Sequence, residues 1–186
     1  MYVLELATRR KTVRKFESKS VPIDRIIPII QVAREAPSGA NYQGWRFHII
    51  KNCEIKKNIR KKSEEGEKKF YQNVSGHWSE WLKNSEINYK KPFLEDAPVL
   101  LVIYRKNDVP YSTESLWLAI GYMLLALEEL NLGTVTYTPS FPEIVEEALE
   151  VPEGYKLEVI LPIGHSIDDK TKEQRKELEK LYNIYS

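Results

Sequence analysis

The stretch from Ser115 to Leu130 (SLWLAIGYMLLALEEL) constrains the fold most, because a helix formed by it is apolar on nearly every side. A helix of this kind lies in a core or against a second subunit, whereas a surface helix keeps one polar face. Its longest apolar run, residues 116–127, is far shorter than the ~20 residues that a membrane-spanning helix requires. The stretch therefore predicts a globular protein built around this helix, with no membrane-spanning segment.

The other predicted elements alternate between helix and strand along the 186 residues. Apolar residues recur with helical spacing from Ile23, with Asp24 as a candidate cap and Pro28 in or near the first turn. A charged tail starts at Asp168. Strands are expected at 46–51, 98–104, 134–138 and 155–163, and helices at 23–36, 142–149 and 54–90, where exposed helices break near 75–76. This order predicts a single α+β or α/β domain over residues 1–186.

Composition argues against several classes of function. The 28 basic and 27 acidic residues leave a net charge of +1, whereas nucleic-acid and membrane-surface partners favour a strongly cationic protein. The single cysteine, Cys53, allows no internal disulfide and no thiolate cluster, and the three histidines lack metal-binding spacing. No signal-peptide pattern is visible at the start. The sequence thus predicts a cytoplasmic protein with no metal site and no nucleic-acid or membrane partner.

The segment from Ala36 to Phe47 (APSGANYQGWRF) has the composition of a ligand-binding loop. Its proline and glycines interrupt regular structure, and its amide, hydroxyl and ring side chains suit a planar ligand that forms hydrogen bonds. An ordinary irregular loop is the alternative interpretation.

A basic cluster at residues 10–14 (RKTVR) offers two guanidiniums, an ammonium and a hydroxyl, which suit a phosphate group. A solvated cationic helix end is the alternative. The chain has no GxxxxGK or GxGxxG motif, no GxSxG motif and no HExxH motif. Phosphate-binding and ring-binding features without an evident catalytic side chain indicate that a cofactor carries the chemistry.

In order along the chain, the basic cluster, the APSGxNxQxW segment, DAPVLLVI at 96–103, the apolar helix ending in LGT and a tail arginine before a charged helix resemble the nitroreductase superfamily of FMN flavoproteins. The resemblance implies a three-layer fold with a central, mostly antiparallel sheet flanked by helices. It also implies an intertwined homodimer with shared active sites, which explains the apolar 115–130 helix. The chain departs from the family at Gly44, where proline is usual, and a looser loop is expected there.

The same resemblance assigns contacts to the cofactor FMN. The residues implied for its phosphate are Arg10, Lys11, Thr12, Arg14 and Arg175. The residues implied for its ribityl chain and ring are Pro37, Ser38, Gly39 and Asn41.

Residues 60–92 resemble the substrate lid of the iodotyrosine deiodinase branch of this superfamily. The branch carries a glutamate, a tyrosine four residues later and a lysine before the DAP strand, which here are Glu67, Tyr71 and Lys91. Glu67 and Tyr71 lie one helical turn apart and share a face. Together the three offer an anion, a hydroxyl and a cation to a zwitterionic amino acid. The alternative is a chance trio on a surface helix rich in lysine and glutamate.

Two further matches concern the flavin ring and the substrate phenolate. Thr136-Tyr137-Thr138-Pro139 resembles the TTTP-like turn of the branch, which implies cofactor contacts from Thr136, Tyr137 and Thr138. Thr138 is implied to hydrogen-bond flavin N5, a contact that favours one-electron steps. Ala40 is implied to offer its backbone N–H to the phenolate.

The resemblance therefore implies an FMN-dependent reductive dehalogenase of halogenated tyrosines, with Thr138 as the catalytic residue. Electrons would come from NAD(P)H or from a separate reductase. Two alternatives stay open. One is a general NAD(P)H-dependent nitroreductase or quinone reductase acting on nitroaromatic substrates, and the other is a non-catalytic flavin- or ligand-binding protein.

Overall fold

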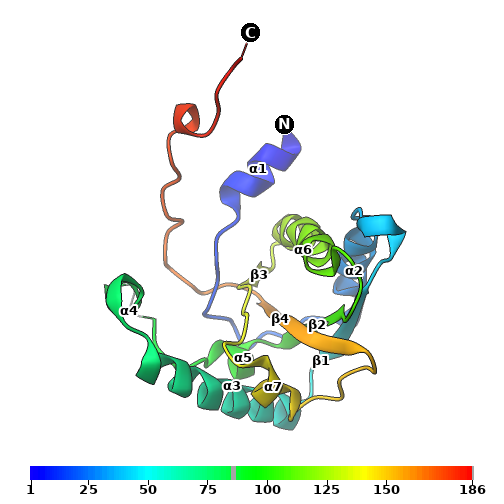
Figure 1. Ribbon diagram of the computed structural model, residues 1–186, viewed down its shortest axis with the longest axis vertical. Helices are drawn as coiled ribbons and strands as arrows, with labels where there is room; N and C mark the ends of the chain where they lie inside the picture. The colour runs from blue at the N-terminus through cyan, green and yellow to red at the C-terminus, as the bar shows by residue number, and fades with distance from the viewer. Residues whose placement is uncertain (85–86, 186) are drawn as a thin grey trace.

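The computed structural model describes residues 1–84 and 87–185, and its four strands form one antiparallel sheet in the order β1-β2-β4-β3 (Figure 1). The strands are β1 (Trp45–Ile50), β2 (Val99–Lys106), β3 (Gly133–Thr134) and β4 (Tyr155–Gly164). The predicted strands at 46–51, 98–104 and 155–163 are confirmed. The run at 134–138 is strand only at its start, although Tyr137 forms an isolated bridge to Ile160. Ser85 and Glu86, inside the predicted lid, and Ser186 lie outside the described residues.

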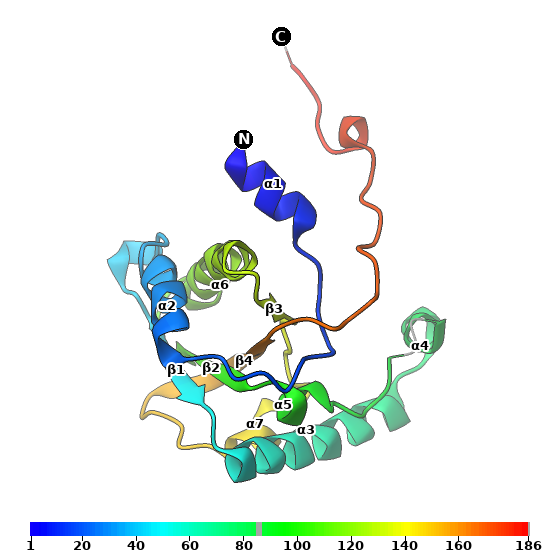
Figure 2. The same cartoon turned by 180° about the vertical axis from the view of Figure 1, so that it is seen from behind.

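The central strands are apolar on both faces because helices cover both sides of the sheet (Figure 2). The helices are α1 (Tyr2–Arg9), α2 (Ile27–Arg34), α3 (Cys53–Asn73), α4 (Gly76–Asn84), α5 (Phe93–Asp96), α6 (Ser112–Glu129) and α7 (Pro142–Glu146). In β2, Leu101 and Ile103 belong to the core beneath α2 and α6, and the alternate residues Leu100 and Val102 belong to the core beneath α3, α5 and α7. This arrangement confirms the predicted three layers.

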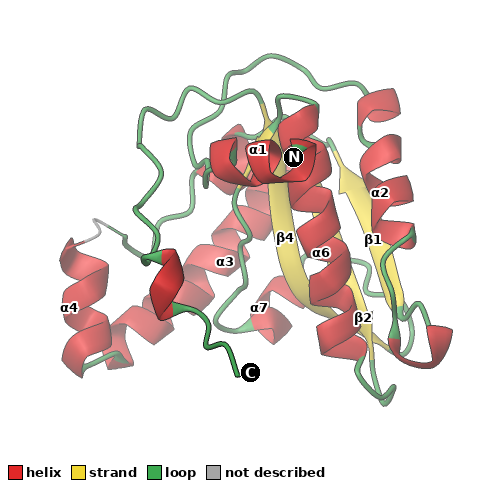
Figure 3. Cartoon of the chain, turned by 90° about the horizontal axis from the view of Figure 1, so that it is seen from above, coloured by secondary structure: helices red, strands yellow, loops and turns green. Residues whose placement is uncertain are grey.

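The apolar helix α6 lies along the sheet next to α2, and α1 also packs against it (Figure 3). One side of α6 is buried in the core. Leu118 and Tyr122, on its other side, are 49% and 42% exposed. A single chain therefore covers only part of the apolar surface of α6.

Among the described residues, no helix combines the length and apolar character needed to cross a membrane.

Helix α3 begins where the Asn52 side chain accepts a hydrogen bond from the Ile55 N–H, and it ends at Asn73. Gly76, with φ of +68°, begins α4, so the predicted break near 75–76 is confirmed. The prediction that this region is merely exposed is wrong for one face of α3. The buried Lys56 ammonium donates to the carbonyls of Glu95 and Ala97, which ties α3 to α5.

Two local predictions are wrong. Asp24 does not cap α2, because a 3₁₀ turn (Ile23–Arg25) precedes the helix and Ile26 occupies the cap position; Pro28 does lie in the first turn. The charged helix expected after Arg175 is also absent: residues 169–177 form no helix, and only a 3₁₀ turn, Leu178–Lys180, follows. This tail runs away from the sheet in Figures 1 and 2. A short helix without a packing surface is marginal in water, which accounts for its absence.

Candidate functional site

A cavity of about 890 Å³ lies between α3, α4, the segment before α5 and the turn at 136–138. Its lining includes Glu67, Tyr71, Lys91 and Arg14. Pockets that bind small molecules enclose roughly 300–1,000 Å³, so this cavity has the size of such a site. The fold thus brings the predicted lid trio, the predicted flavin turn and one member of the basic cluster to a single cavity.

Glu67 and Lys91 form an ion pair inside this cavity. Their side chains are 6% and 8% exposed, and Lys91 Nζ lies 3.7 Å from Glu67 Oε2. The same ammonium lies 5.2 Å from the centre of the Tyr71 ring and donates to the Asn88 carbonyl. Burial lowers the pKa of Lys91, against the opposing effect of Glu67, and burial raises the pKa of Tyr71. The trio predicted from the sequence therefore meets in space.

The other carboxylate oxygen of Glu67 is held by the segment that contains the 136–138 turn. Glu67 Oε1 accepts hydrogen bonds from the Tyr137 hydroxyl at 3.0 Å and from the Ser140 N–H at 3.1 Å. The Tyr137 side chain is buried, whereas Thr136 is half-buried and Thr138 is exposed. Both threonines line the cavity. No sequence pattern predicts that Ser140 takes part, because its contribution is a backbone N–H.

Helix α4 adds an aromatic wall to the cavity. The rings of Trp78 and Trp81 are stacked, with their centres 4.9 Å apart and their planes 4° apart. Both line the cavity and both are partly exposed, at 52% and 39%. The sequence placed these tryptophans in the lid without a role. Their helical spacing of three residues was the available signal that they share a face.

The basic cluster is joined to the start of the tail by Asp168, which sequence reasoning treated only as part of a charged tail. Asp168 accepts the Arg14 N–H at 2.7 Å and the Lys170 N–H at 3.1 Å, and the Lys11 ammonium donates to the carbonyls of Asp168 and Lys170. Burial opposes ionisation of Asp168, but the two N–H donors and Lys11 prevail and lower its pKa. Thr12 forms a backbone bridge to Thr134, which fixes the cluster to the sheet edge.

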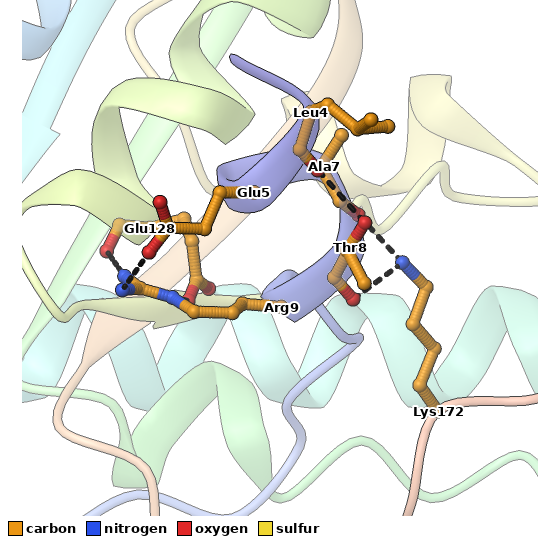
Figure 4. Close-up of polar contacts among 7 residues, drawn as sticks. All are labelled: Leu4, Glu5, Ala7, Thr8, Arg9, Glu128 and Lys172. Atoms are coloured by element: carbon orange, nitrogen blue, oxygen red, sulfur yellow. Dashed lines mark hydrogen bonds and ion pairs between the residues drawn. The ribbon is translucent and has the colours of Figure 1, made fainter. Parts of the chain in front are cut away.

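Lys172 ties the tail to α1, as Figure 4 shows. Its ammonium donates to the carbonyls of Ala7 and Thr8 at 2.6 and 2.9 Å, at the C-terminal end of α1. Partial burial lowers the pKa of Lys172, and Arg175 and Arg10 lower it further. Arg175 of the tail and Arg10 of the basic cluster therefore both lie close enough to Lys172 to affect its pKa.

Helix α1 is also tied to α6. Arg9 Nε lies 3.1 Å from Glu128 Oε1, a contact visible in the same view (Figure 4). A smaller cavity of about 340 Å³, lined by Arg10, Lys11 and His165 among others, lies beside this contact. Helix α1, which directly precedes the basic cluster, thus contacts both the tail through Lys172 and α6 through Glu128.

The predicted flavin loop does not line the larger cavity. Residues 37–41 lie between α2 and β1, on the opposite side of the molecule from α4 (Figure 3). The Gly39 N–H donates to Ser115 Oγ at 3.0 Å, and a Cβ at Gly39 would lie 2.9 Å from Tyr111 Cβ. Ala40 and Asn41 have φ of 49° and 54°, a costly conformation for non-glycine residues. The loop is held in a strained shape on the start of α6.

Gly44 does not loosen this loop, contrary to expectation. It is buried, its φ is not positive, and its carbonyl accepts a hydrogen bond from the Lys106 N–H at 2.8 Å. A Cβ at this position would lie 3.3 Å from Lys106 Cβ. The end of the loop is therefore fixed to the sheet by β2.

Comparisons with known proteins agree with this architecture. The sequence model of the nitroreductase family matches residues 7–165. An iodotyrosine deiodinase of Thermotoga neapolitana is 46% identical over 181 residues, covering 97% of each chain. Human iodotyrosine deiodinase 1 is 35% identical over 179 residues, covering 90% of this chain and 62% of its own.

Solved structures extend the comparison to the fold. Oxidized iodotyrosine deiodinase bound to FMN and 3-iodo-L-tyrosine matches with a TM-score of 0.93 at 46% identity, covering 98% of this chain and 100% of that one. A BluB-like flavoprotein of Clostridium difficile, 23% identical, shares the fold with a TM-score of 0.83 over all of both chains. The match of the family model to most of the sequence, together with these relatives, shows that this chain belongs to the nitroreductase family.

Proposed function

We propose that this protein is an FMN-dependent reductive dehalogenase that acts on halogenated tyrosines. The observation that carries the proposal is the meeting of Glu67, Tyr71 and Lys91 in the cavity that Thr138 and Arg14 also line. Relatives named iodotyrosine deiodinase, one of them bound to FMN and 3-iodo-L-tyrosine, support the same function.

The buried charges account for selection of an amino acid. Lys91 binds the substrate carboxylate, Glu67 binds its ammonium, and Tyr71 adds a hydroxyl. Without substrate the two charges neutralise each other across 3.7 Å. A ligand that lacks one charge leaves its protein partner buried and unpaired, which is costly. The site therefore favours a zwitterion over a simple halophenol. Residues 60–92 act as the lid that carries this trio.

The donor set fits FMN. Arg10, Lys11, Thr12, Arg14 and Arg175 would hold its phosphate. Arg175 and Arg10 both lower the pKa of Lys172 in the present fold. The residues that would contact its ribityl chain and ring are Pro37, Ser38, Gly39, Asn41, Thr136, Tyr137 and Thr138. Thr138 is exposed at the cavity, where its hydroxyl is available to the ring.

FMN, once reduced, supplies the two electrons of the reaction. The carbon–halogen bond breaks, a carbon–hydrogen bond forms, one proton is consumed, and halide and tyrosine leave. Thr138 would be the catalytic residue, because its hydroxyl would contact the reacting ring of the bound cofactor. Ala40 offers its N–H to the substrate phenolate and stabilises the ring in that charged form.

The site is completed by a second copy of the chain. In one chain the 37–41 loop and the cavity lie on opposite sides, so one protomer supplies the cavity and its partner supplies the loop (Figure 3). The exposed Leu118 and Tyr122 on α6 offer an apolar surface for such a homodimer. NAD(P)H or a separate reductase supplies electrons, and the protein works in the cytoplasm.

Anaerobic turnover tests the function. Protein loaded with FMN and reduced chemically is mixed with 3-iodo-L-tyrosine, and iodide and tyrosine are measured. The proposal expects one iodide and one tyrosine for each reduced flavin. Absence of iodide, with rapid reduction of a nitroaromatic compound by NAD(P)H, would instead assign a general nitroreductase. A protein that does not bind FMN would contradict both functions.

A further inference from the structure

The two oxygens of the Glu67 carboxylate have different partners. Oε1 accepts from the Tyr137 hydroxyl at 3.0 Å and the Ser140 N–H at 3.1 Å, whereas Oε2 faces the Lys91 ammonium at 3.7 Å. Two donors use the accepting positions of Oε1. A second cation that approaches this carboxylate therefore meets Oε2, the oxygen that already faces a positive charge.

Tyr137 is itself fixed in place. Its backbone exchanges two hydrogen bonds with Ile160 of β4, at 3.0 and 2.8 Å. Its ring is 6% exposed and meets the Phe93 ring edge-on, with centres 5.7 Å apart. Burial and the charge of Glu67 raise the pKa of Tyr137, so the hydroxyl keeps the proton that it donates. The donor is thus part of the rigid sheet layer, whereas Glu67 belongs to the lid helix α3.

This difference matters when the Glu67–Lys91 pair opens around a ligand. Lys91 then turns to the substrate carboxylate, and an unrestrained glutamate would regain rotamers and leave the ammonium position. The Tyr137 hydroxyl holds Oε1 at a set position relative to Thr138, one residue further along the turn. The distance from the ammonium site to the reacting ring is therefore set by the turn rather than by the lid.

We propose that Tyr137 is a positioning residue for substrate recognition, which holds the Glu67 carboxylate so that Oε2 receives the substrate ammonium. This inference rests on the proposed function and extends it. It gives the Tyr137 side chain a different task from its two neighbouring threonines, which line the cavity toward the flavin. Because the hydroxyl acts through Glu67, its removal affects ligands with an ammonium group more than ligands without one.

A double-mutant cycle tests the proposal on FMN-loaded protein. The dissociation constant of 3-iodo-L-tyrosine is measured by flavin fluorescence for the original protein, Tyr137→Phe, Glu67→Gln and the double variant. Tyr137→Phe is expected to weaken binding about 10-fold, the size of one hydrogen bond to a charged group, and less than about twofold when Glu67→Gln is present. An equal loss in both backgrounds would overturn the proposal.

A second ligand and a matched variant separate positioning from damage. With 2-iodophenol, which has no ammonium, the fold-change caused by Tyr137→Phe is expected to be several times smaller than with iodotyrosine. Tyr104→Phe is the control, because the Tyr104 hydroxyl is buried without a hydrogen-bond partner among the described residues. Its dissociation constant for iodotyrosine should match the original protein. Equal losses for both ligands, or loss of FMN from Tyr137→Phe, would show another role and overturn the proposal.

Different results would contradict the proposed role of Tyr137 and the proposed dehalogenase function. If the original protein binds iodotyrosine and releases iodide while Tyr137→Phe behaves identically, only the role of Tyr137 is wrong. If the FMN-loaded original protein neither binds iodotyrosine nor releases iodide, the dehalogenase function is wrong, and the role of Tyr137 falls with it.

Discussion

Lys91 Nζ lies 3.7 Å from Glu67 Oε2, and both side chains are more than nine-tenths buried. Such a pair contributes little net stability, because desolvation of two charges offsets their attraction. The desolvation cost of burying this pair has a functional explanation if each of the two charges binds a ligand group of opposite charge. Under the proposed function, a zwitterionic amino acid would replace the internal pair with two new ones, so the cavity would never hold an unmatched charge.

Removal of the cation should therefore impair binding of the substrate rather than binding of FMN. Lys91→Met is expected to weaken 3-iodo-L-tyrosine binding at least 10-fold, because the substrate carboxylate loses its partner and Glu67 stays buried. Titration of flavin fluorescence measures the effect. Lys69→Met, a change in an exposed lysine on α3, is the control and should bind normally. Equal affinity for the two variants would exclude Lys91 from the site.

As the pH rises, binding of 3-iodo-L-tyrosine should begin to weaken at a lower pH than it would if Lys91 had the pKa of an ordinary lysine. Burial lowers the pKa of Lys91 from its usual 10.5, so its cation is complete below the lowered pKa and is lost as pH rises through it. Lys91→Arg stays charged throughout. The substrate titrates equally in both experiments, so its effect cancels when the dissociation constant of the original protein is divided by that of Lys91→Arg. As the pH rises, this ratio should begin to increase below pH 10.5, because only the original protein loses its cation. Parallel profiles would refute this role of Lys91.

The 37–41 loop should not tolerate a side chain at Gly39. Gly39→Ala places a Cβ 2.9 Å from Tyr111 Cβ, and such overpacking costs about 1–3 kcal/mol of unfolding free energy. Tyr111→Gly removes the opposing atom at a residue with φ of 56°, a conformation that glycine adopts easily. Urea unfolding should show most of the loss restored in the double variant. Failure of this rescue would mean that the contact is not the cause.

The apolar side of α6 should control both assembly and cofactor retention. Leu118→Glu places a charge at the proposed interface and is expected to yield monomers that retain little FMN, since the partner's loop is lost. Light scattering and the ratio of flavin to protein absorbance measure the two effects. Ile55→Glu, at an exposed site on α3, should remain a flavin-loaded dimer. A flavin-loaded monomer of Leu118→Glu would contradict shared sites.

Asp168 should stabilise the protein mainly when it is ionised. Its folded-state pKa is lowered, so its contribution is present above the unfolded pKa and is lost as pH falls through the folded value. Asp168→Asn is expected to lower the unfolding free energy by about 1–2 kcal/mol at neutral pH, with a smaller difference in acid. Denaturant titrations at both pH values test this. Asp169→Asn, whose side chain is 89% exposed, should change little at either pH.

The local sequence is sufficient to predict those helices and strands whose apolar pattern matches their burial in the fold. The run at 98–104 is apolar throughout because helices cover both sides of β2. The apolar stretch predicted at 115–130 lies almost wholly within α6, which packs one side into the core. The tail was predicted wrongly, since a charged helix needs a packing surface that one chain does not provide.

The residues of the candidate site also fall into two groups: those that the sequence identifies and those whose contacts only the structure shows. Glu67, Tyr71 and Lys91 are identified through the resemblance of residues 60–92 to the lid of the deiodinase branch. The hydrogen bond from Tyr137 to Glu67 joins residues 70 positions apart, and the bond from the Arg14 N–H to Asp168 joins residues 154 apart. No local pattern encodes such contacts, because they depend on how separate elements pack.

The sequence by itself thus determined the main buried strands and the apolar helix, and its family resemblance indicated which side chains are candidates for binding a flavin and a zwitterion. Only the tertiary structure decided that Glu67 and Lys91 share one buried cavity while the 37–41 loop lies on the opposite side of the chain. The physical reason is that residue type and helical or strand period are local properties. Burial, pairing of charges and the division of a site between elements follow from packing across the sheet.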